Sequence, residues 1–233
     1  EHGYVLGIDY MYVGPFDPDV DNYTYALVGV EGAHTNYGMV TLHRDRESEG
    51  AAKGVKEMMR DLHIAGPDPK PVVRLHSDND TSFAGELEQM LIDEKIRQTN
   101  TGGYRPTNNS RTERRIGLLL GSLRAMLYQA TGGTRYYDQL WGRAIVHANK
   151  MVNVSEWSDG TSPYKNRVGK GYEFSDQTDH VFGAKVIYYK PKEVREGKME
   201  MIGHEGVWVG RSTITPDAHL VVPTEWDGGS NRY

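Results

Sequence analysis

The sequence predicts an α/β protein, and two observations support this fold class. Strand-like and helix-like segments alternate through the first 155 positions, as they do where helices pack on a sheet. Hydrophobic residues make up 37% of the 233 residues and charged residues 25%, a balance typical of a globular chain. The length is sufficient for one substantial domain with a sizeable core and a smaller appendage.

Five segments are predicted to be strands, mostly because β-branched and aromatic residues concentrate in them between turn residues. They span residues 4–11, 23–30, 37–43, 72–76 and 95–99. Short turn segments separate the first three, so we expect these strands to form an antiparallel meander. Asp9 lies near the end of the first strand, and Asp78 follows the fourth.

Helices are predicted over residues 47–63, 84–93 and 136–153, and a long helix begins at Ser110. In the long helix, apolar residues recur at three- and four-residue intervals, which indicates one buried face. This stripe consists of Ile116, Leu119, Leu120, Leu123, Met126, Leu127 and Ala130. Glu113 precedes Ile116 by three residues, so we expect Glu113 on the buried face of the first turn.

Beyond Trp157, glycine and charged residues become more frequent, and short strand-like runs occur at residues 184–189, 206–209 and 219–222. We therefore predict a main domain over residues 1–155 and a small β-containing C-terminal extension over residues 156–233. The first residue is not Met and the last residues form no obvious element, so we expect the chain to be a piece of something longer.

The composition excludes several classes of site and partner. There are no cysteines, which excludes disulfides and thiolate zinc sites. No apolar run approaches the roughly 18 to 20 residues that span a bilayer, and no export signal is visible, so we expect a soluble, non-secreted protein without a membrane partner. The formal net charge of −5 argues against a broadly basic surface. Any contact with nucleic acid would therefore depend on local clusters of basic residues.

Asp9, Asp78 and Glu113 are the candidate catalytic and metal-ligating residues. Mg²⁺ prefers oxygen ligands, and two ions roughly 3.5 to 4 Å apart can activate an attacking oxygen and stabilise a leaving one. Asp9 would bridge the two ions, while Asp78 and Glu113 would each complete one. Three carboxylates that meet at one point would indicate bound divalent metal and phosphodiester chemistry.

Each of these carboxylates also has a structural alternative. Asp9 is the hardest to explain in this way, because burying an unpaired carboxylate is costly. Asp78 begins an Asp-Asn-Asp run that favours a turn. Ser110 and Glu113 have the spacing of a capping box, in which the Glu side chain accepts the Ser backbone N–H. The three residues together, rather than any one alone, indicate the site.

Basic and amide side chains gather beside the third carboxylate. They are Arg105, Asn108, Asn109, Arg111, Arg114 and Arg115. With a helix N-terminus they can clamp phosphates, and we predict that they bind nucleic acid. The alternative is a solvated helix face.

Two other groups of polar residues are expected to be structural. The aspartates at positions 17, 19 and 21 lack the Gly and the distal Glu of a calcium loop, so we expect an exposed turn there. His43, His63 and His147 fall in ordinary packed positions.

Three runs of residues resemble the core motifs of a known family, and three later runs resemble its landmarks after the core. The first set is Asp9 with Gly14-Pro15-Phe16, His76–Asn79 with Phe83, and Arg105–Arg114. The second set is Thr161–Tyr164, Val181–Gly183 and Gly206–Gly210. The family is the integrase catalytic core of copia-type retrotransposon polyproteins, within the retroviral integrase superfamily. The resemblance covers nearly the whole chain and includes the spacing of 34 residues, 79–112, between the second and third acids.

The resemblance implies a ribonuclease-H-like fold with a five-stranded mixed sheet flanked by helices. It implies that Asp9, Asp78 and Glu113 bind Mg²⁺ or Mn²⁺, with two ions during catalysis and no small-molecule cofactor. The implied reactions are 3′-end processing, in which nucleotides are removed from the element DNA ends or the ends are used directly, and strand transfer. In strand transfer the 3′-hydroxyl of an element DNA end attacks target DNA, with no covalent protein intermediate. The implied partners are both DNAs and further copies of the chain, in the nucleus for integration and in a cytoplasmic particle before it.

The sequence departs from the family pattern at three positions, where Asp80, Thr107 and Ser110 replace Gly, Gln and Gly. These changes affect loops near the acids rather than the acids themselves. Together with the negative net charge, they leave an alternative open. A decayed or repurposed copy would bind nucleic acid or act in assembly without catalysis. A ribonuclease or junction nuclease of the same fold is disfavoured by the landmarks after the core.

Overall fold

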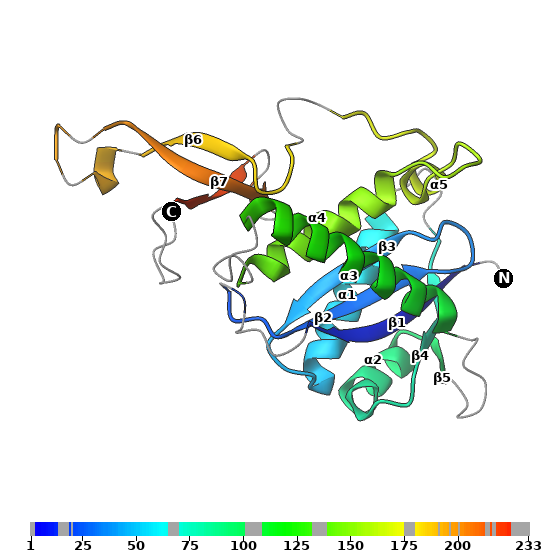
Figure 1. Cartoon of the computed structure of the whole chain (residues 1–233). Helices are drawn as coiled ribbons and strands as arrows, with labels where there is room; N and C mark the ends of the chain where they lie inside the picture. Colours follow the sequence, from blue (N-terminus) through cyan, green and yellow to red (C-terminus); the bar gives the residue numbers. More distant parts are fainter. Residues whose placement is uncertain are drawn as a thin grey trace.

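Five strands form the main sheet in the computed structural model of the chain (Figure 1). They are β1 (Tyr4–Tyr12), β2 (Tyr25–Glu31), β3 (Gly38–His43), β4 (Val72–Ser77) and β5 (Arg97–Asn100). The structure describes residues 3–13, 19, 21–64, 70–100, 109–131, 139–174, 180–190, 192–195, 197–199, 201–212, 215 and 218–224. All five predicted strands are confirmed, with ends that differ by no more than two residues.

The strand order is β3-β2-β1-β4-β5. The first three strands pair antiparallel, as predicted for a meander, whereas β1 pairs parallel with β4 and β4 parallel with β5. The sheet is therefore mixed, and β1 is its central strand. Parallel pairing brings the C-terminal ends of β1 and β4 to the same edge of the sheet, so the chain segments after both strands begin side by side.

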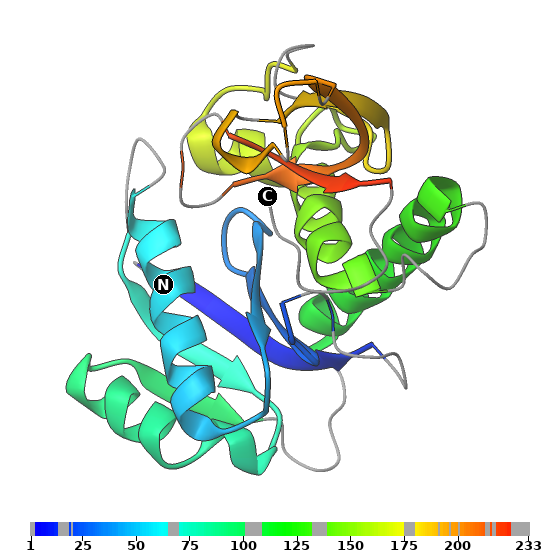
Figure 2. The ribbon, with the colours of Figure 1, turned by 90° about the vertical axis from the view of Figure 1, so that its left-hand side faces the viewer.

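Helices cover both faces of this sheet (Figure 2). On one face lie α1 (Ser48–Ile64) and α2 (Glu86–Asp93), and on the other lie α3 (Ser110–Thr131) and α4 (Trp141–Val154). The alternation of strand side chains explains the two layers, since Leu6 and Ile8 of β1 point into the α1 layer and Met11 into the α3 layer. The predicted apolar stripe of α3 is buried or partly buried along its whole length, which confirms that helix.

A smaller sheet follows the main body. It consists of β6 (Lys185–Tyr189), β7 (Gly203–Arg211) and β8 (His219–Pro223), paired antiparallel in that order. Trp208 of β7 meets His147 of α4 edge-on, with ring centroids 5.3 Å apart. The small β-containing extension is therefore confirmed and packs on α4, while a domain boundary near residue 156 stays a prediction.

One helix in this region, α5 (Pro163–Val168), was not predicted. Its signals are nevertheless in the sequence. Ser162 caps the helix by accepting the Lys165 N–H at 3.0 Å, Pro163 opens it, and Gly169 ends it in the left-handed region with φ 83°. None of the helices that the structure describes is long and apolar enough to cross a membrane.

Two short 3₁₀ turns complete the described elements, η1 (Thr81–Phe83) and η4 (Lys192–Val194). Several predictions fall outside the described residues. These are the Gly14-Pro15-Phe16 part of the first motif, residues 101–108 before α3, and the start of the helix predicted from residue 136.

Candidate active site

Asp9 lies on the central strand β1, on the face that α3 covers. The neighbouring Gly7 shows this orientation, because a Cβ on Gly7 would point at Thr112 of α3, 2.6 Å from its Oγ1 atom. Residues two apart on a strand share a face, so the Asp9 side chain points to the same side as Gly7. The predicted position of Asp9 near the end of the first strand is thus confirmed.

Asp78 directly follows β4 and lies level with Asp9. The parallel register pairs Gly7 with His76, and each aspartate is two residues further along its own strand. Oδ1 of Asp78 accepts the backbone N–H of Asp80 at 3.1 Å, so the turn expected from the Asp-Asn-Asp run is also present. The carboxylate is half-buried.

Asp80 stands where the family has glycine, and it is well accommodated. Its φ of −65° is ordinary for any residue, so no glycine is needed. Its Oδ1 caps η1 by accepting the Ser82 N–H at 2.9 Å, and its Oδ2 pairs with Arg46 at 3.0 Å. These hydrogen bonds lower the pKa of Asp80 against the opposing effect of burial. The Asp80 side chain therefore stabilises this turn.

Glu113 lies in the first turn of α3, but its predicted burial is wrong. The side chain is exposed, and the buried positions on either side of it are Thr112 in the first turn and Arg115 in the second. No hydrogen bond joins Glu113 to Ser110, although the structure describes both residues, so the capping box is absent. Glu113 is an exposed carboxylate whose location depends on the helix that carries it.

The charges of these acids act on one another. Burial raises the pKa of Asp9 to about 6, and the negative charges of Asp78, Glu113 and Asp80 add to this effect. The N–H of Tyr10 partly offsets it. The negative charges of Asp78, Glu113 and Asp80 thus all act on the Asp9 carboxylate.

The carboxylates do not converge on a single point as predicted. Among the described residues, no group of three or more His, Asp or Glu side chains is arranged so as to hold a metal ion. The chemistry of the donor set nevertheless fits a hard divalent cation, because all the donors are carboxylate oxygens and they raise the pKa of Asp9. Residues that would hold such a cation are Asp9 and Asp78 from adjacent strand ends and Glu113 from α3.

The predicted basic cluster divides into three parts. Arg111 and Arg114 are exposed on α3 and lie beside Glu113 in the sequence. Arg115 does not belong to this surface, because it is only 6% exposed and donates from Nη2 to Oδ1 of Asn153. Its burial lowers its pKa to about 10. Arg105 and Asn108 lie outside the described residues.

Asn109 fixes the start of α3 to the central strand. It is 4% exposed, and its Nδ2 donates to the Ile8 carbonyl at 3.3 Å. This bond assigns the amide orientation and leaves Oδ1 as a buried acceptor without a hydrogen-bond partner. Asn109 and Thr112 together anchor the first turn of α3 next to Asp9.

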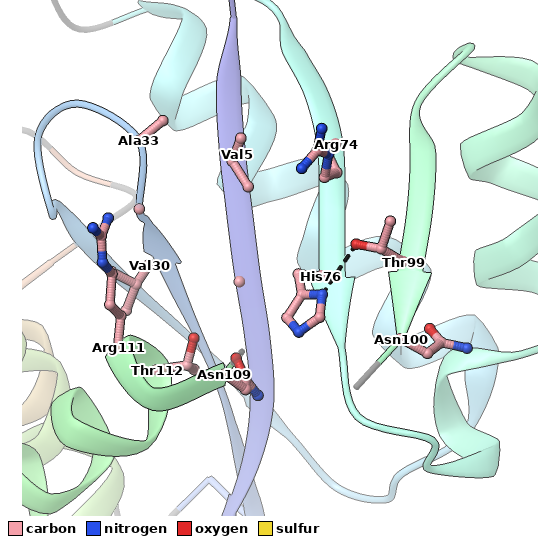
Figure 3. Close-up of a pocket in the computed structure, with 12 residues that line it drawn as sticks. Val5, Val30, Ala33, Arg74, His76, Thr99, Asn100, Asn109, Arg111 and Thr112 are labelled. Atoms are coloured by element: carbon pink, nitrogen blue, oxygen red, sulfur yellow. Dashed lines mark hydrogen bonds between the residues drawn. The ribbon is translucent and has the colours of Figure 1, made fainter. Parts of the chain in front are cut away.

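A cavity of about 520 Å³ lies on the α3 face of the sheet, where Gly7 and His76 line it two residues before Asp9 and Asp78 (Figure 3). Its polar lining side chains come from β4, β5 and α3 with its preceding residue, among them Arg74, His76, Thr99, Asn109, Arg111 and Thr112. Because the Thr99 hydroxyl donates to the Leu75 carbonyl, its oxygen accepts from Nδ1 of His76 at 3.0 Å. Burial lowers the pKa of His76, which favours the neutral ring. The cavity therefore offers cationic and amide groups around the strand positions that precede Asp9 and Asp78.

The sequence did not predict Arg74 as part of this region, and Asp80 was expected there only as a loop residue. His76 was named only as part of a motif. A usable signal was present, because Arg74, His76 and Asp78 alternate along β4 and residues two apart share one face. The predicted location of Asp78 at a strand end therefore also located the side chains that line the cavity.

The aspartates before β2 do not form the exposed turn that was expected. Asp19 is 2% exposed, its Oδ1 accepts the N–H groups of Asp21 and Tyr23 at 2.9 Å, and its other oxygen faces Gly142 at the start of α4. Asp21 pairs with Arg143 of α4 at 2.5 Å. Both acids hold the start of α4, and burial raises the pKa of Asp19 to about 6. Asp17 lies outside the described residues.

No protein-family model and no curated protein sequence matches the chain. Solved structures do match in fold. A chain of the simian T-cell lymphotropic virus intasome, solved in complex with the PP2A regulatory subunit B56 gamma, aligns with a TM-score of 0.54 at 14% identity, over 96% of this chain and 77% of that one. The catalytic core of BIV integrase aligns with a TM-score of 0.50 at 20% identity, over 69% and 91%.

The catalytic core of HTLV-2 integrase, solved in complex with magnesium in a trimeric form, aligns with a TM-score of 0.52 at 14% identity, over 71% of this chain and 96% of that one. At these identities the likeness concerns the fold. The expected ribonuclease-H-like fold, with a five-stranded mixed sheet flanked by helices, is therefore confirmed.

Proposed function

We propose that this chain, which shares its fold with retroviral integrase cores, is a metal-dependent polynucleotidyl transferase. Its reaction is the joining of element DNA ends to target DNA, as in integrases of copia-type retrotransposons. The observation that carries the proposal is that Asp78 and Glu113 both raise the pKa of Asp9, although 34 residues separate them in the sequence. Carboxylates that destabilise one another in this way suit the binding of a divalent cation.

Each element contributes one acid to the proposed site. β1 and β4 hold Asp9 and Asp78 at level positions, and α3 carries Glu113 across the sheet. Bound Mg²⁺ or Mn²⁺, two ions in the full site, would supply charge stabilisation to the reacting phosphate. Asp9 binds in its ionised form, and the protein otherwise orients the attacking 3′-hydroxyl and the target phosphodiester.

DNA contact is proposed for the exposed part of the basic cluster. Arg111 and Arg114 are available to phosphates at the start of α3, and Arg111 also lines the cavity together with His76. Arg105 and Asn108 keep the DNA-contacting role predicted from the sequence. The dimeric and trimeric forms of the HTLV-2 core support a homo-oligomer here, and integration places its action in the nucleus.

The test is strand transfer with duplexes that carry element-end sequence, in Mg²⁺ and in Mn²⁺. Asp9→Asn, Asp78→Asn and Glu113→Gln should each abolish joining while the thermal unfolding transition is retained. Full activity in any one of these variants removes that residue from the proposed set.

A second candidate is a repurposed copy that binds nucleic acid or assembles without catalysis. Two observations favour it: no group of three acids among the described residues is arranged to hold an ion, and the net charge is −5. A wild-type chain that binds element DNA yet shows no heat of Mn²⁺ binding in calorimetry would select this candidate.

A further inference from the structure

Arg115 is a buried guanidinium on the helix that carries Glu113. It lies two residues after Glu113 but points into the protein, where it is 6% exposed. Its Nη2 donates to Oδ1 of Asn153 in the last turn of α4. The same oxygen accepts the N–H of Gly38 at 2.9 Å, and Nδ2 of Asn153 donates to the Gly38 carbonyl at 2.8 Å. Arg115 is thus part of a network that joins α3, α4 and β3.

The network closes the outer edge of the main sheet. β3 is an edge strand, so only every second residue along it can form hydrogen bonds with β2. Tyr37 is one of these residues, because its carbonyl accepts the Glu31 N–H. Gly38 is the next residue, so its N–H and C=O point away from β2. There Asn153 accepts the N–H, and the side-chain amides of Asn149 and Asn153 donate to the carbonyl. A Cβ on Gly38 would collide with the guanidinium of Arg115. The close approach therefore requires glycine at that position.

Among the described residues, no carboxylate forms an ion pair with Arg115, and its Nε is buried without a hydrogen-bond partner. A buried cation without an acidic partner costs free energy that an apolar side chain of similar size would avoid. Stability of the fold alone therefore does not account for an arginine at this position.

Arg115 and Glu113 lie on nearly opposite sides of α3, because two residues correspond to about 200° of helical rotation. Glu113 is exposed and makes no hydrogen bond or ion pair among the described residues. The location of Glu113 therefore depends on the contacts that fix α3 to the rest of the protein. The acids whose charges act on Asp9 are Asp78, Glu113 and Asp80, and Arg115 is not among these groups. Any effect of Arg115 on the site is therefore exerted through geometry.

We propose that Arg115 is a positioning residue for Glu113. Through Asn153 and Gly38 it fixes the second turn of α3 to the sheet edge, as Asn109 fixes the first turn to β1. This restraint holds Glu113 within reach of the ion that Asp9 and Asp78 bind. The inference rests on the proposed function, since it concerns the same metal site.

The test is Mn²⁺ affinity, measured by calorimetry on the full chain. Arg115→Met has similar length but cannot donate a hydrogen bond, and it should weaken binding by about tenfold, the lower end of the loss expected when the groups that orient a metal ligand are removed. Arg115→Lys can still donate to Asn153 and should recover part of the affinity. Asn153→Ala breaks the network from its other end and should match Arg115→Met, which keeps the test decisive if Arg115→Met does not fold.

Leu123→Ala is the matched control, because Leu123 is a buried residue of the same helix outside the network. It should lower the unfolding midpoint and leave the Mn²⁺ affinity of the folded protein unchanged. In a Glu113→Gln background, Arg115→Met should have no further effect on affinity, because it acts through Glu113.

The results distinguish failure of the positioning role of Arg115 from failure of the proposed metal site. Wild-type affinity in Arg115→Met, or an equal loss in the presence and absence of Glu113, overturns the positioning role while the metal site stands. A wild-type chain that binds no Mn²⁺, or binds it as well after Asp9→Asn, overturns the proposed metal site and the positioning role with it.

Discussion

Thr112 of α3 sits directly on Gly7 of β1, with its Oγ1 only 2.6 Å from where a Cβ on Gly7 would lie. This contact brings the helix that carries Glu113 down onto the strand that carries Asp9, two residues before the aspartate. It explains why Gly7 has no side chain, and it links packing to the geometry of the candidate active site.

Gly7→Ala is therefore expected to destabilise the fold by about 1 to 3 kcal/mol, the usual cost of forcing extra volume into a packed contact. Chemical denaturation checks this expectation. Gly117→Ala is the control, because a Cβ there meets nothing within 4 Å and the residue lies inside a helix, so it should stabilise by roughly 0.5 to 1 kcal/mol. Equal stability of wild type and Gly7→Ala would mean that α3 is not pressed against β1 at this point.

Asp9→Asn is expected to stabilise the metal-free protein at pH 7. The folded-state pKa of Asp9, about 6, lies above the ordinary 3.8, so between these two pH values the folded state holds a proton that the unfolded chain has released. At pH 7 the carboxyl is ionised in both states, and its charge destabilises the folded one. The corresponding stability is present below pH 4 and is lost as the pH rises through about 6. Above this range the variant should gain on the order of 1 to 2 kcal/mol after allowance for solvent screening.

Denaturant midpoints of wild type and Asp9→Asn, measured in EDTA from pH 4 to pH 8, check this prediction. The difference between the two proteins should widen as the pH rises. A constant difference would show that the Asp9 carboxylate is not destabilised by burial and by its acidic neighbours.

Mn²⁺ affinity is expected to fall as the pH drops below about 6. In that range Asp9 takes up a proton, and a protonated carboxyl is a poor ligand. Calorimetry in buffers of different ionisation enthalpy should detect proton release on binding near pH 6 and little release at pH 8. Proton release that is independent of pH would place the ion away from Asp9.

Arg111→Ala and Arg114→Ala are expected to weaken DNA binding and to reduce its salt dependence. Each lost phosphate contact should lower the slope of log K against log salt by about 1. Arg124→Ala, an exposed residue further along α3, is the control for the loss of one positive charge. If Arg124→Ala lowers the slope equally, the effect is one of net charge rather than of contacts at the start of α3.

The strands and long helices could be predicted because their signals are local. β1, β4 and α3 each show the right periodicity, and that was sufficient to locate Asp9, Asp78 and the start of the long helix. Burial of single polar residues could not be predicted in the same way. Arg115 reads as part of a basic surface cluster, yet its burial depends on Gly38 and Asn153, which are distant in the sequence.

Asp19 was misinterpreted for the same reason, because the start of α4 covers it. The prediction for Glu113 was wrong in the opposite sense, because burial was expected and the side chain is exposed. Its spacing from Ile116 indicates one face of a helix, but the buried face at this end of α3 is centred on Thr112, Arg115 and Leu119. Ile116 lies at the margin of that face and Glu113 lies in solvent. The capping-box pattern is likewise only a sequence pattern here. In all three cases the deciding contacts, or their absence, come from tertiary packing.

The central claim is that Asp9, Asp78 and Glu113 form one metal site. Crystals of the chain soaked in Mn²⁺, with anomalous difference maps, test it most directly. We expect an anomalous peak between β1 and the end of β4, about 2.1 Å from oxygen atoms of Asp9 and Asp78. The Glu113 side chain should move toward the same ion. A map at saturating Mn²⁺ without a peak at Asp9, or with Mn²⁺ bound only elsewhere, would contradict it.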